Sequence, residues 1–134
     1  MQTDNQLSAH FKRSEFACHC GCGSDYIDMK LVDALEDLRT KPGITEIIVR
    51  SGVRCEEYNK HIGGAEHSQH MLGKAADILV PGLSPMEIYN LAVTVSGLHG
   101  FGVAQHQGFI HVDIRDIPAR WMYDANCREC AWQD

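Results

Sequence analysis

The chain has 134 residues, of which 44% are hydrophobic and 22% charged, and its formal net charge at pH 7 is −6. This length predicts one domain, residues 1–134, large enough to bury its own core. An acidic balance without a Lys/Arg cluster argues against nucleic acid as a partner. Because no apolar run approaches the roughly 18 residues that span a bilayer, we expect no membrane insertion.

The first half of the chain predicts a helix, a strand and a second helix after an irregular start. Residues 1–27 have few periodic apolar positions. Asp28 is a typical N-cap for a helix over 29–40. The β-branched run 44–50 predicts a mostly buried strand, and residues 56–62 predict a short helix that two glycines end.

The second half predicts three strands and one helix. A polar loop up to residue 73 leads into a strand over 75–80. Ser84 and Glu87 form a capping-box pattern that predicts a helix from Pro85 to about residue 96. Residues 102–104 and 109–114 read as a hairpin-like pair of strands, and we expect an α+β fold.

The last of these strands is predicted to have one face with polar, potentially functional side chains and one apolar face. Since side chains alternate along a strand, Phe109, His111 and Asp113 share a face, while Ile110 and Val112 pack into the core. One histidine on such a strand is more often a hydrogen-bonded structural group than a ligand. The interpretation of His111 as a metal ligand is favoured only if other potential ligand residues lie near it.

Those companions are His70, in a glycine-flanked loop, and Asp77, seven residues later on a strand of small residues. A buried carboxylate must be paired or metal-bound, and imidazole and carboxylate are good zinc ligands. Three protein ligands leave a coordination position open, which is typical of catalytic zinc sites. The spacing therefore favours a catalytic zinc centre.

The chain carries a set of motifs: Ser51-Gly52-Val53-Arg54, Asn59, Gly63-Gly64-Ala65, Ser68-x-His70-x-x-Gly73-x-Ala75-x-Asp77 and His111-x-Asp113. Together they resemble the M15 family of zinc peptidases, the D-Ala-D-Ala carboxypeptidases and L,D-endopeptidases that cut peptidoglycan stem peptides. The segments around Phe16–Cys22 and Pro118–Trp121 are similar to short phage or bacterial members of that family, so the resemblance covers most of the chain.

The resemblance implies a small antiparallel sheet flanked by helices, in a hedgehog/DD-peptidase-like zinc fold. It implies His70, Asp77 and His111 as zinc ligands and Arg54 as the group that clamps a substrate carboxylate or carbonyl. A guanidinium suits that role because it offers a bidentate fork. We also expect Ser68 to help place the substrate.

The general base stays open. Some family members carry a Glu three residues before the last zinc His, but Gly108 occupies that position here. His106 resembles the His of other members and is a candidate proton carrier. Asp113 is a candidate either to take a proton or to orient a ligand His.

The six cysteines admit disulfides, a second, structural zinc, or free thiols. Cys-x-Cys-x-Cys at 18–22 and Cys-x-x-Cys at 127–130 are candidates to supply one zinc site jointly and tie the chain ends together. Alternatively, Cys55 bonded to the N-terminal cysteines would brace the neighbouring Arg54.

We therefore expect a monomeric zinc peptidase that acts on bacterial cell-wall peptide by means of a zinc-activated water. The alternative is a non-catalytic zinc-containing peptidoglycan-binding module, for example a phage virion or tail component, and a weaker third option is another zinc hydrolase such as an amidase. No signal peptide is visible, and the localisation stays open. The chain is a candidate for a phage or prophage origin, and phage lysis, virion assembly or a partner would each give access to the wall.

Overall fold

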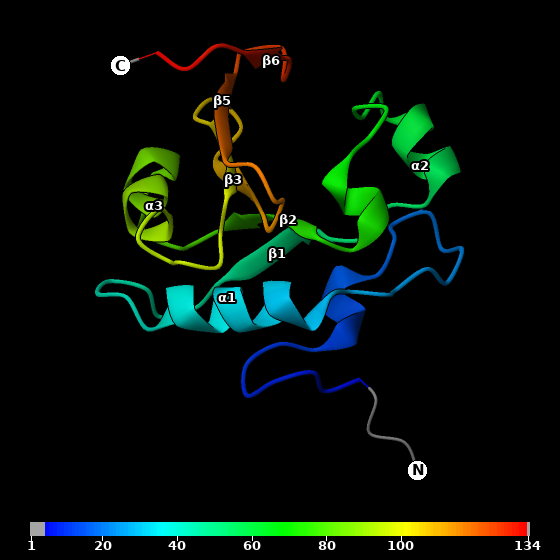
Figure 1. Ribbon diagram of the computed structural model, residues 1–134, viewed down its shortest axis with the longest axis horizontal. Coiled ribbons are helices and arrows are strands. Elements are labelled where there is room, and N and C mark those ends of the chain that lie inside the picture. Colours follow the sequence, from blue (N-terminus) through cyan, green and yellow to red (C-terminus); the bar gives the residue numbers. More distant parts are fainter. Residues whose placement is uncertain (1–4, 134) are drawn as a thin grey trace.

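The computed structural model describes residues 5–133 (Figure 1). Residues 1–4 and 134, which the expected 1–134 domain includes, lie outside the described part. The elements are η1 (Arg13–Phe16), α1 (Met29–Arg39), β1 (Ile48–Ser51), α2 (Glu56–His61), η2 (Gln69–Leu72), β2 (Ala75–Leu79), α3 (Pro85–Ala92), β3 (Gly100–Ala104), β4 (Phe109–Asp113), β5 (Ala119–Tyr123) and β6 (Glu129–Cys130). Among these helices, none combines the length and apolar character that crossing a bilayer requires.

The strands form one six-stranded sheet in the order β1-β2-β4-β3-β5-β6. Four neighbouring pairs are antiparallel, but β3 and β5 run parallel, with Gly102 opposite Trp121. The α+β class is therefore confirmed, and the expected antiparallel sheet is found to be a mixed one, with a single parallel pair among its described strands. The parallel pair arises because the chain leaves β4 and returns on the far side of β3 instead of adding a further hairpin strand.

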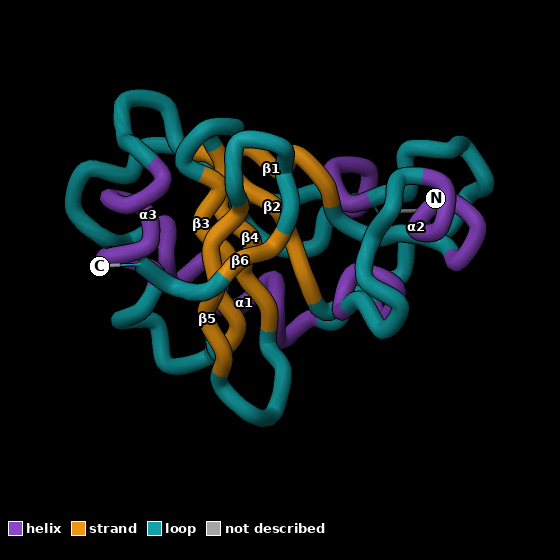
Figure 2. The backbone as a smooth tube through the Cα atoms, turned by 90° about the horizontal axis from the view of Figure 1, so that it is seen from above, coloured by secondary structure: helices purple, strands orange, loops and turns teal. Residues whose placement is uncertain are grey.

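Helices cover one face of the sheet, and the opposite face carries the candidate site residues. Side chains from α1 and α3 share a core with Ile78, Val103, Ile110 and Val112 of the central strands. Strand alternation consequently turns the residues between them, Asp77 among them, to the opposite face. Figures 1 and 2 show α1 along one side of the sheet and α3 and α2 at opposite ends of the molecule.

Several element boundaries differ from the sequence predictions for identifiable reasons. The first strand begins at Ile48 because its pairing with β2 begins there. Helix α3 ends at Ala92, where Thr94 Oγ1 donates a hydrogen bond to the Leu91 carbonyl and competes with the helical pattern. The expected loop before residue 73 contains η2, and the tail supplies β5 and β6.

Glu36 ties the N-terminal segment to α1 and gives the fold a pH dependence at acid pH. It accepts hydrogen bonds from the Ser8 hydroxyl and the His10 backbone, and its carboxylate lies 2.7 Å from His10 Nδ1. Burial raises the pKa of Glu36, but these partners outweigh burial and lower it. The ionised carboxylate therefore stabilises the fold above its ordinary pKa of about 4.3, and this contribution is lost as the pH falls through the lowered value.

We expect Glu36→Gln to lower the free energy of unfolding at pH 7 by about 1 kcal/mol. Its deficit relative to wild type should shrink as the pH falls below about 4. Chemical denaturation at several pH values measures both effects, with the exposed Glu46→Gln as the control. A deficit that is constant with pH would contradict the assignment.

Candidate metal centre and substrate cavity

Two paired strands and one short helix bring the three expected ligands together. Asp77 of β2 lies directly opposite His111 of β4 in the antiparallel register, so both side chains leave the same face of the sheet. His70 comes from η2, where the Ser68 hydroxyl accepts the His70 backbone N–H at 3.1 Å. Gly73, at φ 70°, ends this turn just before β2 begins.

The ligand atoms of these residues form a compact, buried group. Asp77 Oδ1 lies 3.2 Å from His70 Nε2 and 3.3 Å from His111 Nδ1. One potential ligand atom from each residue lies within 4.8 Å of the others, and all three residues are buried. We refer to His70, Asp77 and His111 as the metal centre.

The outer hydrogen bonds of the two imidazoles leave their inner nitrogens as acceptors. The Nδ1–H of His70 donates to the Gly52 carbonyl at 2.7 Å, and the Nε2–H of His111 donates to Asp113 Oδ2 at 2.7 Å. Each ring, when neutral, then directs a lone pair toward the carboxylate of Asp77. Three acceptors facing one another need a proton or a metal cation between them, and two imidazoles with one carboxylate fit a zinc ion.

The electrostatics keep the carboxylate ready for a metal. Burial raises the pKa of Asp77, but the facing imidazoles of His70 and His111 outweigh it and hold that pKa below its usual range. Burial lowers the pKa of His70, which favours the neutral ring. Burial lowers the pKa of His111, but the carboxylates of Asp113 and Asp77 outweigh burial and raise it. Since a metal binds the ionised carboxylate and the neutral imidazole, the shifts of Asp77 and His70 favour binding, whereas a proton on His111 has to leave when a metal binds.

Asp113 lies behind the metal centre and supports it. Its side chain is fully buried and receives hydrogen bonds from His111 and from the Arg115 guanidinium, at 2.6 Å for Arg115 Nη2. Burial raises the pKa of Asp113, but the interactions with His111 and Arg115 outweigh burial, and the pKa lies below its usual range. Because Asp113 does not line the cavity, this position suits orientation of His111 better than proton transfer to substrate.

Asp113→Asn is expected to lower zinc affinity by about 10- to 100-fold, because the amide cannot match the charge of the carboxylate toward His111 and Arg115. Competition with a chromogenic chelator measures the affinity, and thermal unfolding monitors the fold. Asp116→Asn, at an exposed position on the same segment, is the matched control. Unchanged zinc affinity in Asp113→Asn would contradict the positioning role.

Gly100 makes room for the Asp113 carboxylate. A Cβ at this position would lie 2.1 Å from Asp113 Oδ1, and that oxygen is held in place by Arg115. We expect Gly100→Ala to destabilise the protein by about 1–3 kcal/mol and to weaken zinc binding. Gly97→Ala, whose Cβ would come no closer than 3.3 Å to Ala34, should cost less in the same denaturation experiment. Equal stability of the two variants would contradict this steric argument.

The metal centre forms part of the wall of an open cavity of about 990 Å³. Arg54, Ser68 and the aromatic side chains of Trp121 and Tyr123 also line it. Trp121 packs against His111 with ring centroids 5.1 Å apart. Such a volume suits a short peptide segment, and the lining offers both apolar and charged contacts.

The Arg54 guanidinium reaches the metal centre and contacts protein side chains there. Its Nη2 lies 3.3 Å from Asp77 Oδ2 and its Nη1 donates to Asn59 Oδ1 at 3.3 Å. Its Nε is buried and has no hydrogen-bond acceptor among the described residues. Arg54 thus holds a ligand carboxylate while facing the cavity, a double position that the sequence did not indicate.

His106 lies apart from this group. It is exposed in the turn between β3 and β4 and is not among the residues that line the cavity. The structure therefore brings together His70, Asp77, His111, Arg54 and Ser68, with Asp113 behind them, and leaves His106 outside.

Trp121 and Tyr123 line the cavity but are not among the site residues predicted from the sequence. The alternation Trp121-Met122-Tyr123 was the available signal, because it predicts one shared face on a strand. Burial holds the pKa of Tyr123 above its usual range, so this phenol is neutral at pH 7.

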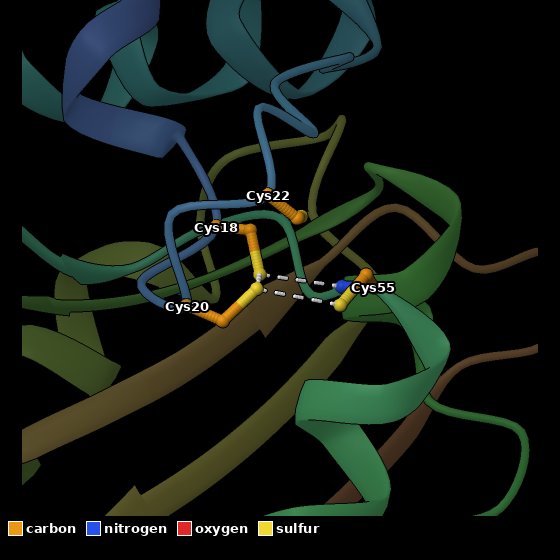
Figure 3. Close-up of side chains that lie close together, drawn as sticks. All are labelled: Cys18, Cys20, Cys22 and Cys55. Atoms are coloured by element: carbon orange, nitrogen blue, oxygen red, sulfur yellow. Dashed lines mark hydrogen bonds between the residues drawn. The ribbon is translucent and has the colours of Figure 1, made fainter.

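The cysteines group differently from the expected site that joins the two chain ends. Cys18, Cys20 and Cys22 lie with Cys55, close enough to hold one metal ion (Figure 3). Within the described residues, Cys127 and Cys130 belong to no such group. The chain-end site is therefore wrong. Cys55 lies beside the N-terminal cysteines, as the alternative expected, but no disulfide joins these described cysteines.

Comparison with known proteins agrees with this geometry. The family model described as Peptidase M15 matches residues 9–113, which include the metal centre, Arg54, Ser68 and Asp113. No curated protein matches the chain. The matched segment ends with β4, so β5 and β6 lie beyond it. Since the match covers more than half of the 134 residues, the chain belongs to the peptidase M15 family.

Proposed function

We propose that the protein is a zinc-dependent peptidase that hydrolyses peptidoglycan stem peptides, as a D-Ala-D-Ala carboxypeptidase or an endopeptidase. The observation that carries the proposal is the buried metal centre at an open cavity in a chain of the peptidase M15 family. A zinc ion held there would polarise the scissile carbonyl and lower the pKa of a water molecule.

The chain's own residues supply position and charge. Asp113 and the Gly52 carbonyl hold the two imidazoles of the metal centre in one tautomer each. Arg54 would bind a carboxylate or carbonyl oxygen of the peptide while keeping its contact with Asp77. Trp121 and Tyr123 would pack against the peptide and exclude water from the bond to be cut.

The test is incubation of the zinc-loaded protein with purified stem peptides, followed by mass spectrometry of the products. Release of a terminal D-Ala identifies a carboxypeptidase, and two internal fragments identify an endopeptidase. Peptides that remain intact at a protein concentration that saturates binding would contradict the proposal.

A second candidate is a non-catalytic module that binds peptidoglycan. One observation favours it: in the described residues, the only carboxylates that line the cavity besides Asp77 are Glu66 and Glu129, both exposed, while His106 lies outside. The described cavity lining therefore offers no buried carboxylate as a base besides Asp77, and its histidines outside the metal centre are His19 and His67. Binding of the stem peptide without cleavage in the same experiment would favour this candidate, as a phage virion or tail component acting at the cell wall.

A further inference from the structure

A second group of metal-ligating side chains lies outside the metal centre. Three of them, Cys18, Cys20 and Cys22, come from the loop after η1, and Cys55 precedes α2. We call these four residues the thiol cluster. Their sulfur atoms all lie within 4.8 Å of one another, and Figure 3 shows the sulfurs of Cys18, Cys20 and Cys55 side by side.

The spacing of the sulfur atoms matches a tetrahedral metal site. Zinc bound by four thiolates at about 2.3 Å places neighbouring sulfurs about 3.8 Å apart. Cys18 Sγ lies 3.5 Å from Cys20 Sγ, and Cys20 Sγ lies 3.6 Å from Cys55 Sγ. One sulfur, that of Cys20, is thus close to two others at once, whereas a disulfide would join it to a single partner at about 2.05 Å.

The loop is bent so that three alternate cysteines reach one point. In an extended strand, residues two apart are separated by about 7 Å. Here Gly21 and Gly23 adopt φ values of 82° and 91°, which only glycine adopts readily, and fold the chain back. The Cys18 N–H closes the loop by donating to the Ser24 carbonyl at 2.8 Å.

Backbone N–H groups point at three of the sulfurs. Cys55 N–H donates to Cys18 Sγ at 3.5 Å, Ser24 N–H to Cys22 Sγ at 3.4 Å, and Tyr58 N–H to Cys55 Sγ at 3.4 Å. Donors directed at sulfur stabilise the negative charge of a thiolate, which is the form that binds a metal. This arrangement is independent of the sulfur spacing and favours the same ligand.

We propose that the thiol cluster binds a structural zinc ion through four cysteine thiolates. Four protein ligands leave no open position, so this ion takes no part in hydrolysis. Its effect would be on Arg54, which precedes Cys55 in the chain. Arg54 N–H donates to the His70 carbonyl at 3.1 Å, and Val53 N–H donates to the Phe16 carbonyl at 2.7 Å. The zinc ion would therefore lock the N-terminal segment against the residue that faces the cavity.

Zinc content and cobalt spectroscopy test this site without reference to activity. The full chain, purified with zinc, should hold two zinc ions. Replacement of zinc by cobalt should give the intense thiolate-to-cobalt charge-transfer bands of a four-sulfur site, because the metal centre contains no sulfur. His70→Ala should lose one zinc and keep these bands, whereas Cys20→Ser should lose one zinc and the bands. Cys130→Ser, outside the cluster, is the matched control and should lose neither.

Alkylation of the wild-type protein covers the case in which Cys20→Ser does not fold. With zinc bound, mass spectrometry should find Cys127 and Cys130 modified and the thiol cluster protected, and a strong chelator should remove that protection. One zinc ion per chain, with the cluster thiols alkylated in the native protein or joined in disulfides, would overturn the proposal. Either result leaves the proposed peptidase activity to its own test, because the thiol cluster and the metal centre share no residue.

Discussion

His70→Ala is expected to abolish zinc binding at the metal centre and to lower the rate of stem-peptide hydrolysis by about 1000-fold or more. The ring would supply one of the three proposed ligands, and its loss would leave Asp77 and His111 alone around the ion. The remaining pair cannot reproduce a three-ligand site, since η2 is the element that closes the group opposite β2 and β4. Elemental analysis of the purified variant and mass spectrometry of stem-peptide products measure the two losses.

His61→Ala is the matched control, because His61 is exposed at the end of α2 and outside the metal centre. It should keep the zinc content and the rate of wild type. Thermal unfolding of both variants distinguishes loss of metal from loss of fold. Full activity in a His70→Ala protein that lacks zinc at the metal centre would refute the proposed function.

The sequence predicted that His70, Asp77 and His111 would lie together, because buried histidine and aspartate side chains need polar partners or a metal. A histidine and an aspartate seven residues apart, flanked by small residues, cannot be buried without polar partners or a metal. In the strand of His111, polar side chains that could bind a metal alternate with apolar ones. What the sequence could not show is the register that puts Asp77 directly opposite His111. Strand register depends on contacts between segments that are distant in the chain.

Contacts between segments that are distant in the chain also explain the two wrong predictions, the grouping of the cysteines and the missing strand β5. Loop-closure entropy grows only slowly with length, so bringing Cys18 to Cys55 or to Cys130 costs nearly the same in chain entropy, and spacing alone cannot choose. The contact of the residue 52–55 segment with Phe16 decides it. Strand β5 was missed because it is short and its parallel partner β3 is separated from it in the chain by all of β4, although the alternation Trp121-Met122-Tyr123 favoured a strand.

The role of Asp113 became distinguishable only with its neighbours in view. As a residue two positions after His111, it fitted both a base and an orienting group. Three observations place Asp113 behind His111. Arg115 donates a short hydrogen bond to Asp113, Gly100 leaves room for the Asp113 carboxylate because it has no side chain, and Asp113 does not line the cavity. Arg115, two residues further along the chain, was a signal for this pairing, because alternate residues of an extended segment share a face.

Arg54→Ala is expected to lower kcat/KM for stem peptides by about 30- to 1000-fold, the equivalent of roughly 2–4 kcal/mol. The guanidinium contacts Asp77 and Asn59 and also faces the cavity, so its removal leaves a buried carboxylate with one partner fewer. Arg54→Lys should recover little, since a lysine ammonium cannot span Asp77, Asn59 and a substrate oxygen as a planar fork does.

Zinc affinity and kinetics, measured on the same preparations, separate the two roles of Arg54. If Arg54 binds substrate, KM rises steeply in Arg54→Lys while zinc content stays near that of wild type. Arg39→Ala is the control, because Arg39 donates to the Thr45 carbonyl at the end of α1 and does not line the cavity. A loss of kcat/KM that merely parallels a loss of zinc would mean that Arg54 acts on Asp77 alone, and the substrate clamp would have to be sought in another cavity arginine, with Arg50 the first to test.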